Sequence, residues 1–287
     1  MSFTPSHIAT LATKAAIDDL HILLKSLDFW NRNPPTVYLY CDAAVRAALP
    51  SIGYTGEIIT KEALNPYSSL NRAQMERLPG IRKNLFFDFV CEKLNLLDWV
   101  FSTTKAKGVL FLDADICFLA PLFEIPRGTT FAVSPHHIRE QDEAKYGVYN
   151  AGMLWVKDSA TVALWRSACD NSSFYEQIAI EDVVTKIFAT AGTVYQIPLT
   201  ENYGWWRLFQ GRRPAEDIQK EWSFNHKNSP GSGITVNGIP LGSVHTHFTE
   251  TRDAATTAYN TWVLTMLRIA AKAHEPTRRF MEHLGWK

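Results

Sequence analysis

The sequence predicts an α/β fold in which a largely parallel β-sheet is covered by helices on both faces. Short β-rich runs alternate with segments of helical periodicity along most of the 287 residues, the order that parallel sheets require. The run Val109–Leu112 is apolar at every position, so it suits a central strand whose two faces are both covered. Hydrophobic residues make up 46% of the chain, which is enough to fill a core. Since the chain has no internal repeat and no clear linker, we expect one domain over residues 1–287.

The first hundred residues are expected to supply three strands and three helices. The strands are predicted at residues 7–13, 37–41 and 57–60, and the helices at 15–29, just before Pro50, and at 82–103. In the first helix, apolar residues recur at helical spacing from Ile17 to Leu27. The pair Pro34-Pro35 stops that helix, because proline cannot continue it and restricts the residue before.

The rest of the chain continues the alternation and then becomes rich in loops. Strands are predicted at residues 109–112, 131–134, 152–156, 193–197 and 243–248, and helices at 159–169, 181–190 and 253–274. Glycine and proline accumulate between Gly211 and Gly242, which favours loops there. In sheets of this kind, ligands bind beyond the carboxyl ends of the strands, so we look for chemistry at that edge.

The balance of charge argues against two classes of partner. The chain has 29 Lys and Arg against 29 Asp and Glu. A protein that binds nucleic acid without sequence preference, or one that is anchored to a membrane by a polybasic segment, needs excess positive charge. No apolar run reaches the ~18 residues of a membrane span, and residues 1–10 lack the features of a secretory signal. The four cysteines lie in apolar stretches and are expected as buried thiols. We therefore expect a cytoplasmic protein without a membrane span.

The strongest chemical signal is the sequence Asp113-Ala114-Asp115 at the end of the apolar strand. Two carboxylates two residues apart point the same way in extended backbone, and burying them is costly without a counter-charge. A divalent cation, Mg²⁺ or Mn²⁺, suits carboxylate oxygens. Two chemistries use this arrangement, phosphoryl transfer and glycosyl transfer. The phosphatases of the haloacid-dehalogenase type keep the motif on their first strand, whereas about 100 residues precede it here, which disfavours them.

Four segments, in order, resemble the nucleotide-sugar glycosyltransferases of the glycogenin-like group, glycosyltransferase family 8, and related GT-A enzymes. The segments are Ile8–Thr13, Phe111–Asp115, Tyr149–Met153 and Val244–Phe248. The resemblance implies a GT-A, Rossmann-like fold with a central, mainly parallel sheet. It implies a metal-dependent glycosyltransferase that moves a sugar from a nucleotide sugar, with UDP as the expected nucleotide, to a glycan or other hydroxyl acceptor. The alternatives are a Mg²⁺-dependent phosphatase or phosphotransferase, and a sugar-nucleotide-binding protein without turnover.

The resemblance also assigns parts of the chain to the two substrates. It places the nucleotide in residues 1–120 and the acceptor in residues 121–252, with a closing helix over 253–287. The implied donor contacts are Thr10, Ala12, Thr13, Arg82, Lys83, Asp113, Ala114, Asn150, Ala151 and Gly152. Among them, Asn150 is expected to bond sugar hydroxyls, and Gly152 to let the backbone come close.

The metal shell implied by the resemblance combines the two aspartates with a late histidine. Asp115 is expected to bind Mn²⁺ or Mg²⁺ directly, and Asp113 to contact the metal, directly or through water, or the ribose. His247 is expected to be the third ligand. His245 is its rival, because alternate residues of a strand share a face and both could reach the site.

An acidic pair and a tryptophan pair complete the predicted site. Glu181-Asp182 stands where the family tends to have Asp-Gln and is the catalytic candidate, with a carboxylate at the acceptor hydroxyl or the anomeric centre. Acidic residues also favour helix starts, so the pair could simply begin a helix. Trp205-Trp206 is the candidate acceptor platform, since aromatic faces stack on sugar rings, and the alternative is ordinary core packing.

Overall fold

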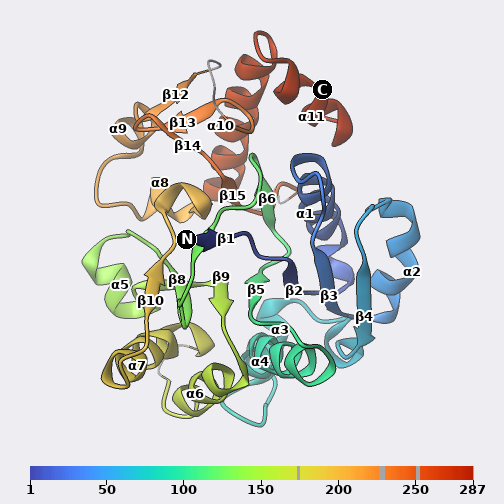
Figure 1. The fold of residues 1–287 in the computed structure, drawn as a ribbon, viewed down its shortest axis with the longest axis vertical. Helices are drawn as coiled ribbons and strands as arrows, with labels where there is room; N and C mark the ends of the chain where they lie inside the picture. The colour runs from blue at the N-terminus through green and yellow to red at the C-terminus, as the bar shows by residue number, and fades with distance from the viewer. Residues whose placement is uncertain (173–174, 226–229, 250–252, 287) are drawn as a thin grey trace.

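A computed structural model describes residues 1–172, 175–225, 230–249 and 253–286. Its centre is a seven-stranded sheet with the order β10-β8-β9-β5-β2-β3-β4 (Figure 1). The strands are β2 (His7–Ala12), β3 (Thr36–Cys41), β4 (Ile58–Glu62), β5 (Val109–Leu112), β8 (Phe131–Pro135), β9 (Tyr149–Val156) and β10 (Val194–Gln196). Only β9 runs against its neighbours β5 and β8 in this sheet. The predicted α/β class with a mainly parallel sheet is confirmed.

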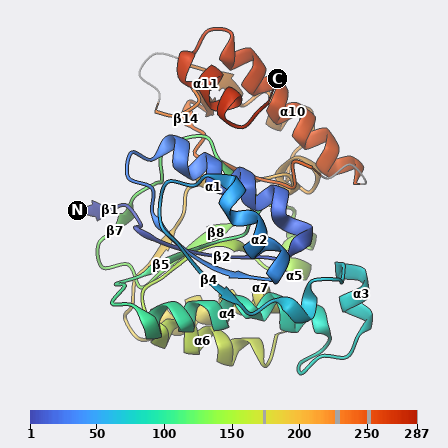
Figure 2. The same ribbon diagram turned by 90° about the vertical axis from the view of Figure 1, so that its right-hand side faces the viewer.

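Helices cover both faces of the sheet (Figure 2). One face carries α1 (Ile17–Trp30) and α2 (Ala43–Ile52), and the other carries α4 (Leu85–Thr103), α6 (Ser159–Cys169) and α7 (Tyr175–Ala189). Alternate residues of a strand point to opposite faces of the sheet. In β3, Leu39 lies in the hydrophobic cluster that contains α1, and Tyr40 lies in the cluster that contains α4. Every residue of β5 is buried, as its continuous apolar sequence predicts for a central strand.

A smaller part of the molecule is built on the strand that follows Asp115. The strand β6 (Ile116–Phe118) joins β15 (Ser243–His245) and β11 (Tyr203–Gly204) in a separate three-stranded sheet. A second small sheet holds β12 (Trp222–Phe224), β13 (Ile234–Val236) and β14 (Ile239–Pro240). Except for β14, these strands share one hydrophobic cluster with α10 (Ala254–Ala271) and α11 (Glu275–His283) (top of Figure 1). The remaining elements are β1 (Ser2–Phe3), β7 (Ile125–Pro126), α3 (Arg72–Arg77), α5 (Glu140–Tyr146), α8 (Trp206–Phe209), α9 (Ala215–Gln219) and three short 3₁₀ turns at Lys14–Ala16, Asn65–Tyr67 and Leu199–Glu201.

Two predicted helix starts are wrong. The long helix α4 begins at Leu85 rather than at residue 82, because the Asn84 side chain accepts the Phe87 N–H and caps it. Arg82 therefore lies in the loop before the helix. Helix α7 begins at Tyr175 rather than at residue 181. Its buried face already includes Glu176, Ala179 and Ile180, which lie before the predicted start.

The helix predicted over 253–274 corresponds to α10. The segment predicted as one closing helix over 253–287 contains a second helix, α11, which follows His274 and has Pro276 in its first turn. Proline is well tolerated there because its missing N–H has no partner in a first turn. The predicted end of the helix at residue 287 lies outside the described residues. The four cysteines are buried and unpaired as predicted. Among the helices described, none is both long enough and apolar enough to cross a bilayer.

Candidate metal and donor site

The backbone at Asp113–Asp115 connects β5 to β6 and is hydrogen-bonded to β9 and to the residue after β15. The Asp113 N–H donates to the carbonyl of Gly152 at 2.7 Å, which ties the end of β5 to β9. The Asp115 carbonyl accepts the Thr246 N–H at 2.9 Å, just after β6 pairs with β15. The motif is therefore the junction between the central sheet and the smaller sheet. This junction explains why residues 130 positions apart meet.

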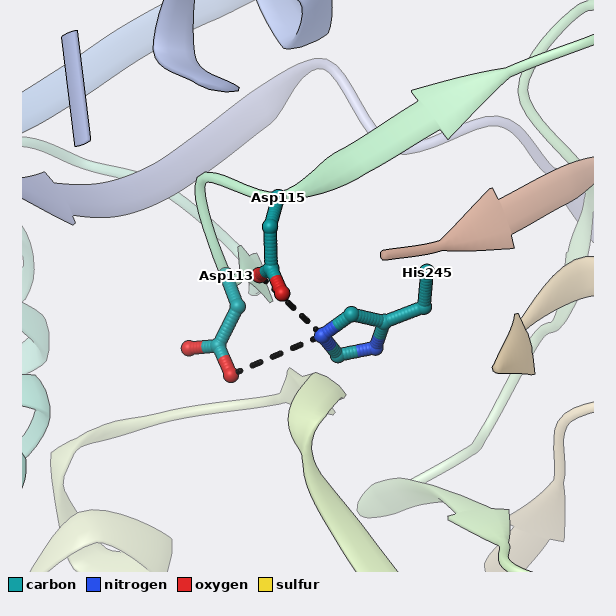
Figure 3. A group of neighbouring side chains, drawn as sticks. All are labelled: Asp113, Asp115 and His245. Atoms are coloured by element: carbon teal, nitrogen blue, oxygen red, sulfur yellow. Dashed lines mark hydrogen bonds and ion pairs between the residues drawn. The ribbon is translucent and has the colours of Figure 1, made fainter. Parts of the chain in front are cut away.

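The side chains of Asp113, Asp115 and His245 converge on one point (Figure 3). The Nε2 atom of His245 lies 3.1 Å from Asp115 Oδ1 and 3.9 Å from Asp113 Oδ2. One potential ligand atom from each residue lies within 4.8 Å of the others. Two carboxylate oxygens and one imidazole nitrogen form a donor set that suits Mn²⁺ or Mg²⁺. The residues present therefore fit a divalent cation.

His247 approaches the same aspartate from the solvent side. Its Nε2 atom lies 3.4 Å from Asp115 Oδ2, and its Nδ1 atom lies 2.7 Å from Asp19 Oδ2. The side chain of His247 is 54% exposed, whereas that of His245 is only 5% exposed. Both histidines thus reach Asp115, and the choice of His247 over His245 as the ligand stays a prediction.

Charges within the cluster shift the protonation of its members. The carboxylate of Asp115 raises the pKa of His247 to about 10, against the effect of burial and with help from Asp19. Burial alone would raise the pKa of Asp115, but His245 and His247 outweigh it and hold that pKa below its ordinary value. Asp115 is therefore a carboxylate at neutral pH, the form that binds a cation.

A buried lysine, missed by the sequence analysis, supports Asp113 from the other side. Lys93 Nζ lies 3.2 Å from Asp113 Oδ1 and 2.8 Å from Glu176 Oε1, and it also donates to the carbonyl of Ala151. Burial would lower the pKa of Lys93, but the two carboxylates outweigh it and raise that pKa. A signal was present in the sequence: Lys93 lies four residues before Leu97, on the buried face of α4.

The predicted donor residues Asn150 and Gly152 lie directly beside the cluster. Asn150 is buried, and its Oδ1 accepts the Gly152 N–H at 2.9 Å. A Cβ atom at residue 152 would collide with the ring of His245 and the carboxylate of Asp113. Glycine is thus required there because the side chains of the cluster come close to the backbone.

The other predicted donor residues fall into two groups. Thr10, Ala12, Thr13, Ala114 and Ala151 are buried at the carboxyl ends of β2 and β5 or the start of β9. Arg82 and Lys83 lie in the loop before α4. There Arg82 packs over the ring of Phe87 and lies 3.9 Å from Asp170, while Lys83 is exposed.

The acidic pair lies within α7 and not at its start. Glu181 Oε1 accepts the Val148 N–H at 2.8 Å, and Asp182 is exposed. One turn earlier, Gln177 Oε1 accepts the Ala151 N–H at 3.2 Å. Gln177 and Glu181 therefore share the face of α7 that lies along the start of β9. Gln177 is a further site neighbour that the sequence analysis missed.

The tryptophan pair is only partly available for stacking. Trp206 is buried, with its ring centroid 5.0 Å from that of His245 and 5.4 Å from that of His136. Its ring therefore already packs against the cluster. Trp205 is half-buried and meets Trp206 edge to face.

Comparison with known proteins gives matches of structure only. No protein-family model and no curated protein sequence matches the chain. The galactosyltransferase LgtC, solved with donor and acceptor sugar analogues, matches 97% of this chain and 95% of its own, with 14% identity and a TM-score of 0.53. The bifunctional glycosyltransferase WbbM matches at 9% identity and a TM-score of 0.53, with 98% of this chain covering 52% of that one. GlyE of Streptococcus pneumoniae TIGR4 matches at 14% identity and a TM-score of 0.50, with 91% covering 60%.

These solved neighbours are all glycosyltransferases, and their likeness extends over nearly the whole chain. At such low identity the likeness concerns the fold. Placement in glycosyltransferase family 8 stays a prediction. The architecture of this chain is the GT-A glycosyltransferase fold that the sequence predicts.

Proposed function

We propose that the chain is a metal-dependent glycosyltransferase that takes a sugar from a nucleotide sugar, with UDP as the nucleotide, and passes it to a glycan or other hydroxyl acceptor. The convergence of Asp113, Asp115 and His245 at the carboxyl end of β5 carries this proposal. The fold supports it, because LgtC has that fold and its structure contains donor and acceptor sugar analogues.

The residues of the cluster would have different roles in binding the donor. Departure of a nucleoside diphosphate builds negative charge on two phosphates, and a bound Mn²⁺ or Mg²⁺ supplies the Lewis acid that stabilises it. Asp115 and a histidine would hold the cation. Asp113 shares its charge with Lys93, so it would contact the cation or the ribose. The positive charge of Lys93 also limits the repulsion between Asp113 and the phosphates.

Other residues are proposed to bind the two ends of the substrate. Thr10, Ala12 and Thr13 would line the nucleotide, because β2 ends beside β5. Trp205 is the better placed of the two tryptophans to meet an acceptor, since it is half-buried whereas Trp206 is covered.

The test combines ligand-induced stabilisation with turnover. The melting temperature is measured with UDP, GDP, CMP and dTDP, each with and without Mn²⁺, because a ligand of the native state raises it by mass action. We expect the largest rise with UDP and Mn²⁺ together. We expect Asp115→Ala to lose that rise and to lose UDP release from UDP-sugars, whereas the surface control Asp217→Ala keeps both.

Each alternative has its own signature in the same assays. Full turnover in EDTA or in Asp115→Ala would refute the metal dependence. Hydrolysis of a generic phosphoester without any sugar nucleotide would favour the phosphatase. Tight binding of UDP without UDP release from any sugar nucleotide would favour a binding protein.

A further inference from the structure

A fully buried asparagine connects the predicted cation site to Asn150, a predicted donor residue. Asn202 lies between a 3₁₀ turn and β11, and none of its surface is exposed. Its Oδ1 atom lies 3.0 Å from Nδ1 of His245. Its Nδ2 atom lies 2.8 Å from Ser134 Oγ and 3.1 Å from Asn150 Oδ1. One side chain thus bonds residues of β8, β9 and β15.

The backbone fixes the orientation of these side chains one after another. The Gly152 N–H can only donate, so the atom of Asn150 that faces it at 2.9 Å is the oxygen. That oxygen also faces Asn202, so the facing atom of Asn202 is its NH₂ group. The other end of the Asn202 amide is then its oxygen, and it faces His245. An oxygen there requires a proton on Nδ1 of His245.

The far end of the network gives the same assignment independently. The carbonyl of Gly147 can only accept, so Nδ1 of His136 donates to it at 3.0 Å. Burial lowers the pKa of His136 to about 4, so its ring is neutral at pH 7 and its Nε2 accepts. The NH₂ group of Asn150 lies 3.4 Å from that Nε2. The oxygen of Asn150 therefore points toward Gly152 and Asn202, as the first argument requires.

We propose that Asn202 is the positioning residue of the cation site, because it holds the Nδ1–H of His245 and so directs Nε2 at Asp113 and Asp115 as a metal ligand. The inference rests on the proposed metal-dependent function and deepens it. Metal-binding histidines commonly donate their second ring N–H to a fixed acceptor, which sets the tautomer and the ring orientation. The ring of Trp206, 5.0 Å from that of His245, packs against the same imidazole.

The two histidines therefore differ in how firmly they are held. His245 is buried, and its ring is hydrogen-bonded to Asn202. Asn202 is hydrogen-bonded in turn to Asn150, which is fixed by the backbone N–H of Gly152 and, through His136, by the carbonyl of Gly147. His247 is half-exposed, and among the described residues its Nδ1 contacts the carboxylate of Asp19. We thus assign His245 as the preorganised ligand, with His247 as the residue that approaches the cation from solvent.

The first test reads the position of the proton directly. In ¹⁵N-histidine-labelled protein loaded with Mg²⁺ at mildly alkaline pH, long-range ¹H–¹⁵N spectra distinguish a protonated ring nitrogen from one with a lone pair. The His245 signals are assigned from their absence in His245→Gln. We expect Nδ1 to carry the proton. A neutral ring protonated on Nε2 would overturn the proposal, whether or not the protein transfers sugar.

The second test measures the affinity for Mn²⁺ alone, from the electron paramagnetic resonance signal of the free ion. We expect Asn202→Leu to weaken binding by about 10- to 100-fold, the scale for lost outer partners of metal ligands. Asn202→Asp keeps an oxygen for the Nδ1–H and should retain more affinity than the leucine variant. Ser134→Ala is the matched control: it removes one bond to the same Asn202 amide without changing its orientation, so we expect a change below about 3-fold.

The outcomes separate this inference from the proposed function. Wild-type affinity in both Asn202 variants would overturn the role of Asn202 while leaving the metal-dependent function standing. Failure of the wild-type protein to bind Mn²⁺, with or without UDP, would refute the proposed metal dependence itself. If the leucine variant does not fold, the aspartate variant and the tautomer measurement decide.

Discussion

At the scale of single residues, the structure separates the two members of the acidic pair. Glu181 faces the start of β9 through its bond to the Val148 N–H, whereas Asp182 is exposed on a different side of α7. Neighbouring helix residues differ by ~100° around the axis, so both cannot face the donor equally. Glu181 lies on the same face of α7 as Gln177, whose Oε1 accepts the Ala151 N–H.

We therefore expect different results from the two amide variants. Glu181→Gln should lower turnover by about 10²-fold or more, the usual scale for a catalytic carboxylate, while UDP binding stays near the wild-type value. Asp182→Asn is the matched control and should keep the wild-type rate. The rates are measured as UDP released under saturating donor. Wild-type rates in both variants would show that neither carboxylate takes part in the chemistry.

Single residues were predictable where a local pattern carries the information. Asp113 and Asp115 follow an apolar strand, and that spacing was enough to place them together. The sequence does not predict Asn202, because its partners lie on other elements and no local spacing indicates them. The spacing of Lys93 from Leu97 places the lysine on the buried face of α4, but it does not reveal that Asp113 and Glu176 are its partners. Pairings between distant elements come from the tertiary structure, in which β6 joins a second sheet.

At the scale of elements, the buried ion pairs of Lys93 join helix α4 to β5 and α7. Removing the positive charge of Lys93 would leave two carboxylates, Asp113 and Glu176, facing each other with little solvent. We expect Lys93→Met to lower the free energy of unfolding by about 3–5 kcal/mol, the cost of breaking a buried pair. Urea denaturation followed by circular dichroism measures this change.

A surface lysine provides the control for that measurement. Lys220 pairs with Asp217 in solvent, so Lys220→Met should change stability by less than about 1 kcal/mol. A similarly small effect of Lys93→Met would mean that Asp113 and Glu176 do not depend on the lysine for their charge.

Element boundaries were less predictable than element types. The strand at Val109–Leu112 and the helix at 159–169 agree with the structure residue by residue, because apolar runs and periodicity mark them. The start of α7 was misplaced because Glu181-Asp182 imitates the acidic first turn that helices favour. The predicted start of α4 is three residues too early because the helix is capped by Asn84 and begins at Leu85.

At the scale of the whole molecule, the α/β class was predictable because alternating strands and helices permit few arrangements. The small sheet of β12, β13 and β14 was not, since the region from Gly211 to Gly242 has the composition of loops. Every residue of its central strand β13 is buried, and β13 shares a hydrophobic cluster with α10 and α11, a packing that local sequence does not reveal.

The stability of the whole molecule should depend on pH through one buried carboxylate. Burial raises the pKa of Glu201 from 4.5 to about 7, and within the described residues its Oε2 has no hydrogen-bond partner. The backbone of Gly242 packs directly against that oxygen. The native state thus keeps the proton that the unfolded chain releases above pH 4.5. The contribution of Glu201 to the free energy of unfolding is therefore highest below pH 4.5. It falls by about 3 kcal/mol in all as the pH rises to 7.

We expect Glu201→Gln to remove this dependence, because the amide keeps the shape and cannot ionise. The variant should match the wild-type protein near pH 4.5 and exceed its free energy of unfolding by up to about 3 kcal/mol at pH 8. Urea midpoints at pH 4.5, 6 and 8 measure the difference, and Glu216→Gln, at an exposed position, is the control that should show none. A constant difference between Glu201→Gln and wild type at all three pH values would mean that Glu201 ionises with the same pKa in the native and unfolded states, which would contradict the raised pKa.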